Sequence, residues 1–229
     1  MIEPLVPRAH VAGLKFDKEA HRYTMEGIVL PTTTGIIRAG GMSFFGTSAP
    51  SVTTPNMQIG KWIHDMLRMH FLGTLVEDSL SHAMRHILGR VKEWADDNAI
   101  APLAVEVPLA HSVYWYGGTP DLVARRVLKD EIAVVDWKSG SAQASDVLQL
   151  GGYVELVRDC YDVGNTKIVA IPAYLKDMII GRKPRTIRGI ELEGARGVFL
   201  AAHACYKWRS VNGMLPAEEK HSDAGGGQG

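Results

Sequence analysis

Hydrophobic residues change their spacing along this chain, and the changes predict alternating helices and strands. They recur every three or four positions over residues 57–71 and again over 79–97, as expected for two amphipathic helices. The pattern then shortens to apolar runs of strand length, separated by Gly, Pro and charged residues. These runs predict four strands, at 103–109, 113–116, 119–127 and 131–137.

The pattern after these strands predicts the rest of a core. A helix is expected at 142–161, a buried strand at 166–173 and a closing helix at 193–211. Two weaker strands, at 178–180 and 186–192, would form a hairpin around a Gly- and Pro-containing turn. Helices and strands that alternate in this way indicate an α/β fold with a central sheet.

The N-terminal part of the chain has shorter elements than the core. Its pattern predicts strands at 14–16, 21–24 and 27–30, a helix at 31–39, and a mobile loop at 42–55. The last residues are polar and rich in glycine, which predicts a disordered tail. We therefore expect three parts: an N-terminal region (1–56), a core (57–215) and a tail (216–229).

Composition indicates a water-soluble globular protein and limits the kinds of site it can carry. Of the residues, 46% are hydrophobic and 22% are charged, and 25 basic residues balance 25 acidic ones. No overall positive field favours nucleic acid, so such binding would need local clusters of charge. The two cysteines, Cys160 and Cys205, exclude an iron–sulfur cluster held by four thiolates of this chain. We find no secretory signal or membrane span and expect a cytoplasmic protein.

Two short motifs carry the strongest chemical signal. A Gly-Thr-Pro-Asp sequence ends at Asp121, and a strand-length gap separates it from Asp136-Trp137-Lys138. Strand alternation puts Asp136 and Lys138 on one face and Trp137 on the other. Two carboxylates at neighbouring strand ends would bind Mg²⁺ or Mn²⁺, and a lysine beside them would orient an attacking water. The alternative is a solvated surface ion pair without function.

Three further residues extend this candidate site. Glu106 lies within an apolar run, where a carboxylate is costly unless it is exposed, paired or bound to a metal. His64 and Arg68 are one helical turn apart, so a metal ligand and a phosphate-binding group would share one face. Glu106 on an exposed edge strand and His64 as a packed helical residue remain alternatives.

The helix after Lys138 adds a second polar pair. Gln149 and Tyr153 are four residues apart and share a face, and the two intervening glycines allow close approach of a backbone or a ligand. A structural tyrosine is the alternative. The densest basic cluster follows later in the chain and would bind phosphates or simply be solvated: Arg182, Lys183, Arg185 and Arg188.

In order and spacing, these motifs resemble the PD-(D/E)xK nuclease superfamily, in particular its RecB-like exonuclease branch. The resemblance covers about residues 60–173 and includes His64, Asp121, the Asp136-x-Lys138 triplet and Gln149 with Tyr153. Glu106 occupies the position where such proteins often carry an acid. Some relatives hold an iron–sulfur cluster through four cysteines. This chain has only two, which favours the simpler phage-type members.

The resemblance implies a restriction-endonuclease-like α/β core with a mixed central β-sheet flanked by helices. His64, Asp121, Asp136 and the backbone carbonyl of Trp137 would hold Mg²⁺ or Mn²⁺, with Glu106 as an outer or second-site ligand. Lys138 would position water. Gln149, Tyr153, Arg68 and the basic cluster would contact DNA.

The same resemblance implies a metal-dependent DNA exonuclease in recombination, repair or phage genome processing. We expect it in a bacterial or phage-infected cell, with a recombination or single-strand-binding protein as a candidate partner. A structure-specific endonuclease and a non-catalytic DNA-binding module with the same fold remain alternatives. Strand polarity, strand preference and oligomeric state are left open.

Overall fold

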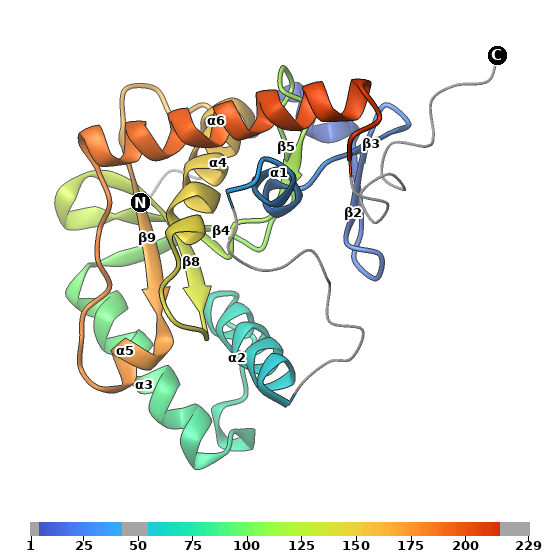
Figure 1. Cartoon of the computed structure of the whole chain (residues 1–229). Coiled ribbons are helices and arrows are strands. Elements are labelled where there is room, and N and C mark those ends of the chain that lie inside the picture. Colours follow the sequence, from blue (N-terminus) through green and yellow to red (C-terminus); the bar gives the residue numbers. More distant parts are fainter. Residues whose placement is uncertain (1–4, 43–54, 216–229) are drawn as a thin grey trace.

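A four-stranded sheet of mixed orientation forms the centre of the molecule (Figure 1). The computed structural model describes residues 5–42 and 55–215, and of residues 55–57 it describes the backbone alone. In spatial order the strands are β4 (Ile100–Val105), β7 (Leu122–Arg126), β8 (Glu131–Lys138) and β9 (Lys167–Tyr174). The first three are antiparallel neighbours, and β9 runs parallel to β8. The predicted α/β fold with a mixed, helix-flanked central sheet is confirmed.

Helices cover both faces of this sheet (Figure 1). One face packs against α4 (Ala144–Cys160), which in turn contacts α6 (Gly189–Val211) and α1 (Thr33–Ala39). The other face packs against α2 (Pro55–Phe71), α3 (His82–Asp97) and α5 (Leu175–Ile179). Strand β8 is therefore almost entirely buried, as expected for a continuous apolar run in a central strand.

Alternation along β8 divides the hydrophobic core into two clusters. Ile132 and Val134 pack on the α4 side, whereas Ala133, Val135 and Trp137 pack on the side of α2 and α3. The even-numbered face continues into Asp136 and Lys138 at the carboxyl end of the strand. The core thus fixes the face on which these two polar residues lie, and the prediction for Trp137 is confirmed.

The N-terminal region forms a small antiparallel sheet beside the core. Its strands are β1 (Leu14–Asp17), β2 (Arg22–Met25) and β3 (Ile28–Leu30), as the sequence predicts. Short 3₁₀ helices lie at Ala9–Gly13, Glu77–Ser79 and Val127–Lys129. The mobile loop predicted at 42–55 falls, apart from its two end residues, outside the described residues, as does the tail predicted at 216–229.

The strand predicted at 113–116 is wrong. This segment is a compact turn between two short paired strands, β5 (Leu109–Ala110) and β6 (Gly117–Gly118). Within the turn, Trp115 has a φ of 55° and donates its N–H to the carbonyl of His111 at 3.0 Å. Tyr116, within this turn, is fully buried. A buried aromatic residue in a turn gives the same sequence pattern as one in a strand, which explains the wrong prediction.

The hairpin predicted over 178–192 is also wrong. Leu175 and Met178 are buried one turn apart in α5, and α6 begins at Gly189, before the predicted start at 193. Between these helices, Ile187 makes an isolated bridge to Ala170 of β9. Apolar residues in this segment therefore pack singly against the core. Their spacing in the sequence resembles that of a strand, although no strand forms there.

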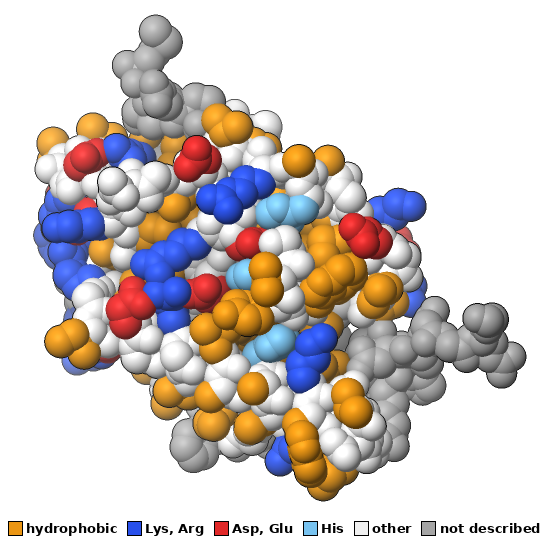
Figure 2. Space-filling view, turned by 90° about the horizontal axis from the view of Figure 1, so that it is seen from above, with side chains coloured by type: hydrophobic (Ala, Val, Ile, Leu, Met, Phe, Trp, Pro, Cys, Tyr) orange, Lys and Arg blue, Asp and Glu red, His pale blue; other side chains and the backbone are white. Residues whose placement is uncertain are grey.

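The face of the molecule on the side of α6 carries both acidic and basic side chains (Figure 2). Viewed from that side, basic, acidic, histidine and hydrophobic side chains lie intermingled (Figure 2). This mixture agrees with the equal numbers of acidic and basic residues in the chain. Across the described residues, no helix combines the length and apolarity needed to cross a membrane.

Candidate metal centre

Asp121 and Asp136 lie opposite each other where β7 begins and β8 ends. Leu122 pairs with Val135 in the antiparallel register, so the next cross-strand pair joins the two aspartates. Asp121 Oδ2 accepts the backbone N–H of Trp137 at 2.7 Å. The N–H and C=O of a strand residue point toward the same neighbouring strand, so the Trp137 carbonyl faces the Asp121 side.

The N-terminal region braces the Gly-Thr-Pro-Asp loop. The Thr33 hydroxyl donates to the Gly117 carbonyl at 3.1 Å, and Tyr23 Oη lies 2.7 Å from Thr119 Oγ1. Gly118 packs so tightly that a Cβ atom there would lie 2.5 Å from Thr33 Oγ1 and 2.8 Å from Tyr153 Cε1. The motif requires glycine because the loop is pressed between the N-terminal region and α4.

Helix α2 supplies a histidine and an arginine to the same edge of the sheet. His64 Nδ1 lies 3.4 Å from Asp121 Oδ1, and Arg68 Nε lies 3.5 Å from Glu106 Oε2. Four residues before His64, a Cβ atom on Gly60 would lie 2.9 Å from Ser139 Oγ. This glycine therefore lets α2 approach the chain directly after Lys138.

Glu106 reaches the cluster through a change in backbone conformation. It follows the end of β4, has a φ of 46°, and donates its N–H to the Asp121 carbonyl at 3.1 Å. It is therefore not part of a strand, and the strand predicted at 103–109 ends at Val105. Donor atoms of His64, Glu106 and Asp121 all lie within 4.8 Å of one another.

Lys138 is held by three polar side chains on the α4 side of the sheet. Its Nζ lies 2.6 Å from Asp136 Oδ2 and 3.6 Å from Asp146 Oδ1, and it donates to Gln149 Oε1 at 2.7 Å. Gln149 in turn donates to Tyr153 Oη at 2.7 Å. The ammonium group is thus fixed beside Asp136 by α4.

Burial and neighbouring charge shift the proton affinities in this cluster. Burial raises the pKa of Asp136 from 3.8 to about 6, although Lys138 acts in the opposite direction. Burial, with the charge of Asp121, also raises the pKa of Glu106. Burial lowers the pKa of His64, but the hydrogen bond and charge of Asp121 outweigh it, so this pKa is raised. Carboxylates crowded in this way favour a bound cation.

The donor set fits a hard divalent cation. Carboxylate oxygens of Glu106, after β4, and of Asp121, before β7, converge with one imidazole nitrogen from His64 of α2. Oxygen donors suit Mg²⁺ and Mn²⁺, and the added imidazole is better tolerated by Mn²⁺. Asp136 lies across the strand pair from Asp121 and has Lys138 as its direct partner.

The glycine pair in α4 has a packing role. A Cβ atom on Gly151 would lie 2.8 Å from the backbone of Ala195 in α6, and one on Gly152 would lie 2.8 Å from the Phe199 ring. The close approach of a backbone that the sequence allows is observed at Gly151. Tyr153 is only 7% exposed, so its hydroxyl orients Gln149 from within the core.

The ion pairs of the basic cluster join it to other residues than those of the candidate metal centre. Arg188 pairs with Glu131, which begins β8, whereas Lys138 ends it. Every other member also has an acidic partner: Arg182 with Asp177, Lys183 with Asp97 and Arg185 with Glu191. DNA contact by these residues stays a prediction.

Asp146 and Tyr174 belong to the candidate site but do not stand out in the sequence. Asp146 is 8% exposed, accepts the Tyr174 hydroxyl at 3.0 Å and the Gln143 N–H at 2.9 Å, and faces Lys138. An acid three residues inside a helix start is a capping signal that could have identified it. Tyr174 gives no such signal, because its place depends on the parallel pairing of β9 with β8.

Comparison with known proteins gives this chain no family. No protein-family model matches the sequence, and no curated protein matches it either. Any functional assignment therefore depends on the arrangement of residues described above.

Proposed function

We propose that this protein is a Mg²⁺- or Mn²⁺-dependent nuclease of the PD-(D/E)xK type, with a restriction-endonuclease-like core. One observation carries the proposal: His64, Glu106 and Asp121 converge within 4.8 Å beside a strand end that presents Asp136 and Lys138. A bound divalent cation would polarise a phosphodiester and lower the pKa of an attacking water.

The residues of the chain have separate roles in this proposal. His64, Asp121, Asp136 and the Trp137 carbonyl would hold the cation. Glu106 would act as an outer ligand or as a ligand of a second cation. Lys138 stabilises the negative charge that develops on the phosphate and orients the water. Its position is set by Asp146 and by Gln149, which Tyr153 holds.

Arg68 is a second basic residue placed to approach a phosphate at this site. Its Nε is buried, makes no hydrogen bond within the part of the chain that the structure describes, and lies 3.5 Å from Glu106 Oε2. A guanidinium group held only loosely by one acid can exchange that partner for a phosphate oxygen. We therefore assign Arg68 to substrate binding, and a cation bound near Glu106 would free it for that contact.

Digestion of labelled DNA tests the proposed activity. End-labelled single strands, linear duplex and closed circular duplex are incubated with Mg²⁺, Mn²⁺ or a chelator. We expect metal-dependent cleavage of the linear substrates, with the circle resistant, as for an exonuclease. Cleavage of the circle would indicate an endonuclease, whereas binding without cleavage in either metal would refute a hydrolytic function.

The assignment of His64 has its own test. His64→Ala should raise the Mn²⁺ concentration needed for half-maximal cleavage by about tenfold or more, because one ligand of the cation is lost. His86→Ala changes an exposed histidine on α3 and is the matched control. An unchanged metal dependence in His64→Ala would show that His64 is not a metal ligand and only packs within the helix.

A further inference from the structure

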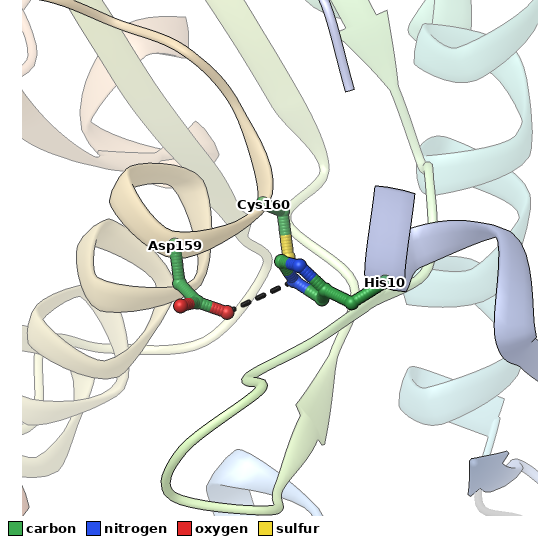
Figure 3. A group of neighbouring side chains, drawn as sticks. All are labelled: His10, Asp159 and Cys160. Carbon is green, nitrogen blue, oxygen red and sulfur yellow. Dashed lines mark ion pairs between the residues drawn. The ribbon is translucent and has the colours of Figure 1, made fainter. Parts of the chain in front are cut away.

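A second group of metal-binding side chains lies at the opposite end of α4 from the candidate metal centre. Asp159 and Cys160 close the helix, and His10 reaches them from the 3₁₀ helix near the N-terminus (Figure 3). Their donor atoms lie within 4.8 Å of one another. Asp159 is ten residues beyond Gln149, which corresponds to about 15 Å along the helix.

Backbone pairing fixes the two chain segments that meet here. The Arg8 N–H donates to the Cys160 carbonyl at 2.8 Å, and Pro7 forms an isolated bridge with Tyr161. The N-terminal segment therefore runs along the end of α4, and His10 is held above its last turn. The cluster joins two parts of the chain about 150 residues apart, a distance in sequence at which a cross-link constrains the unfolded chain strongly.

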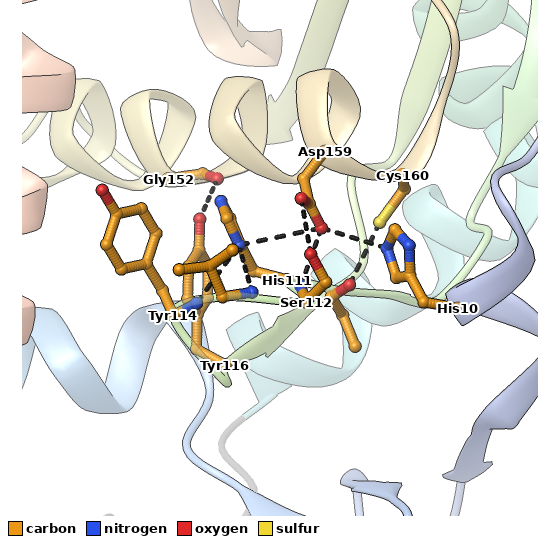
Figure 4. A network of polar contacts seen from close by, with 10 residues as sticks. His10, His111, Ser112, Tyr114, Tyr116, Gly152, Asp159 and Cys160 are labelled. Atoms are coloured by element: carbon orange, nitrogen blue, oxygen red, sulfur yellow. Dashed lines mark hydrogen bonds and ion pairs between the residues drawn. The ribbon is translucent and has the colours of Figure 1, made fainter.

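Asp159 is held in place by a polar network (Figure 4). Its Oδ1 accepts the Ser112 hydroxyl at 2.8 Å, and its Oδ2 accepts the Ser112 N–H at 2.7 Å. The same Oδ2 lies 3.0 Å from His10 Nε2 and 3.7 Å from His111 Nδ1. The carboxylate therefore has a fixed orientation toward His10.

His10 Nε2 lacks a satisfactory partner in this arrangement. The atom is buried and makes no hydrogen bond with any described residue, although it forms an ion pair with Asp159 Oδ2 at 3.0 Å. A ring nitrogen and a carboxylate oxygen that face each other without an aligned hydrogen bond can both bind one cation. The imidazole side chain remains 24% exposed, so an ion could reach the cluster from solvent.

A nucleophilic role for Cys160 does not fit the geometry. The thiol is fully buried and donates to the Ala110 carbonyl at 3.2 Å. Burial raises the pKa of this thiol to about 12, so it carries no thiolate at neutral pH unless a metal displaces the proton.

We propose that His10, Asp159 and Cys160 form a zinc site that fastens the N-terminal segment to the end of α4. One thiolate, one imidazole and one carboxylate are typical Zn²⁺ ligands, whereas the first centre offers no sulfur. Tetrahedral Zn²⁺ separates such donors by about 3.4–3.6 Å, so side-chain shifts of about 1 Å would complete the geometry. On binding, Cys160 gives up its thiol proton to solvent and its Sγ bonds to the metal.

A water molecule would occupy the fourth coordination position of the Zn²⁺ ion. His111 also lies beside Asp159, but its Nδ1 already accepts the N–H groups of Val113 and Tyr114 at 3.2 and 3.3 Å. The site lies at the far end of α4 from Lys138 and its partners. Its occupancy should therefore change the stability of the protein and leave the proposed chemistry at the first centre unaltered.

Cobalt spectroscopy on the full-length protein tests the site. Co²⁺ substitutes for Zn²⁺, and a thiolate ligand produces a charge-transfer absorption that oxygen and nitrogen ligands do not. We expect this absorption in the wild type and in Cys205→Ser, which changes the exposed cysteine. It should be absent from Cys160→Ser and strongly reduced in His10→Ala, which alters a partly exposed side chain and should fold normally.

Thermal unfolding gives an independent readout. Zn²⁺ at about a hundredfold excess over its Kd should raise the Tm of wild type by about 5–10 °C more than that of His10→Ala, since any Zn²⁺ at the first centre stabilises both proteins alike. Absence of the sulfur absorption in folded wild-type protein, or its persistence in Cys160→Ser, would overturn the proposal. An equal Zn²⁺-dependent rise in Tm for wild type and His10→Ala would also overturn it.

Discussion

Replacing Asp136 with asparagine should make the metal-free protein more stable at alkaline pH. The carboxyl is 4% exposed, and burial raises its pKa from 3.8 to about 6. A raised pKa means that the folded state disfavours the charged form more than the unfolded state does. Asparagine has nearly the same shape and carries no charge, so the substitution removes this penalty.

The size of the effect follows from the pKa difference and depends on pH. Well below pH 3.8 the carboxyl is protonated in both states, and the penalty is absent. It grows as pH rises from about 4 to about 6, where the unfolded state loses its proton first, and reaches about 3 kcal/mol above that range. Lys138 loses its partner at 2.6 Å in the variant, which offsets part of the gain. We expect a net stabilisation of about 1–2 kcal/mol at pH 8.

Urea unfolding with a chelator present, at pH 8 and at pH 4, measures this difference. The midpoint of Asp136→Asn should exceed that of wild type at pH 8, and most of the advantage should be lost at pH 4. Asp177→Asn is the matched control, because Asp177 forms a surface pair with Arg182 and is 45% exposed. A variant less stable than wild type at pH 8 would refute the reasoning and show that the pair with Lys138 dominates.

Three further predictions concern packing, positioning and reactivity. Gly118→Ala should lower the free energy of unfolding by about 1–3 kcal/mol through overpacking, whereas Gly89→Ala, with open space around its Cβ, should raise it by about 0.5–1 kcal/mol; urea unfolding compares them. Asp146→Asn should reduce the cleavage rate about tenfold without changing the half-saturating Mn²⁺ concentration, because Lys138 loses a charged neighbour; an altered metal requirement instead would contradict this role. In metal-free native protein, a thiol reagent should modify the exposed Cys205 rapidly and Cys160 only after unfolding. Mass spectrometry of labelled peptides measures both rates, and faster labelling of Cys160 would contradict the prediction.

Strand alternation allowed the placement of Asp136, Lys138 and Trp137 to be predicted from the sequence. A continuous apolar run fixes β8 as a central strand, and its two-residue period assigns each side chain to a face. The approach of Asp121 followed from the strand-length gap between the motifs. These predictions succeeded because they depend on local geometry that the hydrophobic pattern records directly.

Glu106 and the segment over 178–192 show where the pattern gives too little information. Glu106 leaves its strand through a left-handed backbone conformation, and alternation contains no signal for that change. In the segment over 178–192, buried residues contact the core singly, so their spacing matches neither a strand nor a helix. His10 and Cys160 lie far apart in sequence, and only the path of the N-terminal segment brings them together.

The cleavage rate of Asp121→Asn in Mn²⁺ tests the central claim most directly. Asp121 contacts His64, accepts the Trp137 N–H and lies across from Asp136, so it is the acid common to every part of the proposed centre. We expect wild type and Asp177→Asn to degrade end-labelled linear DNA in Mn²⁺, and Asp121→Asn to be slower by at least about a hundredfold while remaining folded. Metal-stimulated cleavage by Asp121→Asn at the wild-type rate would contradict the account.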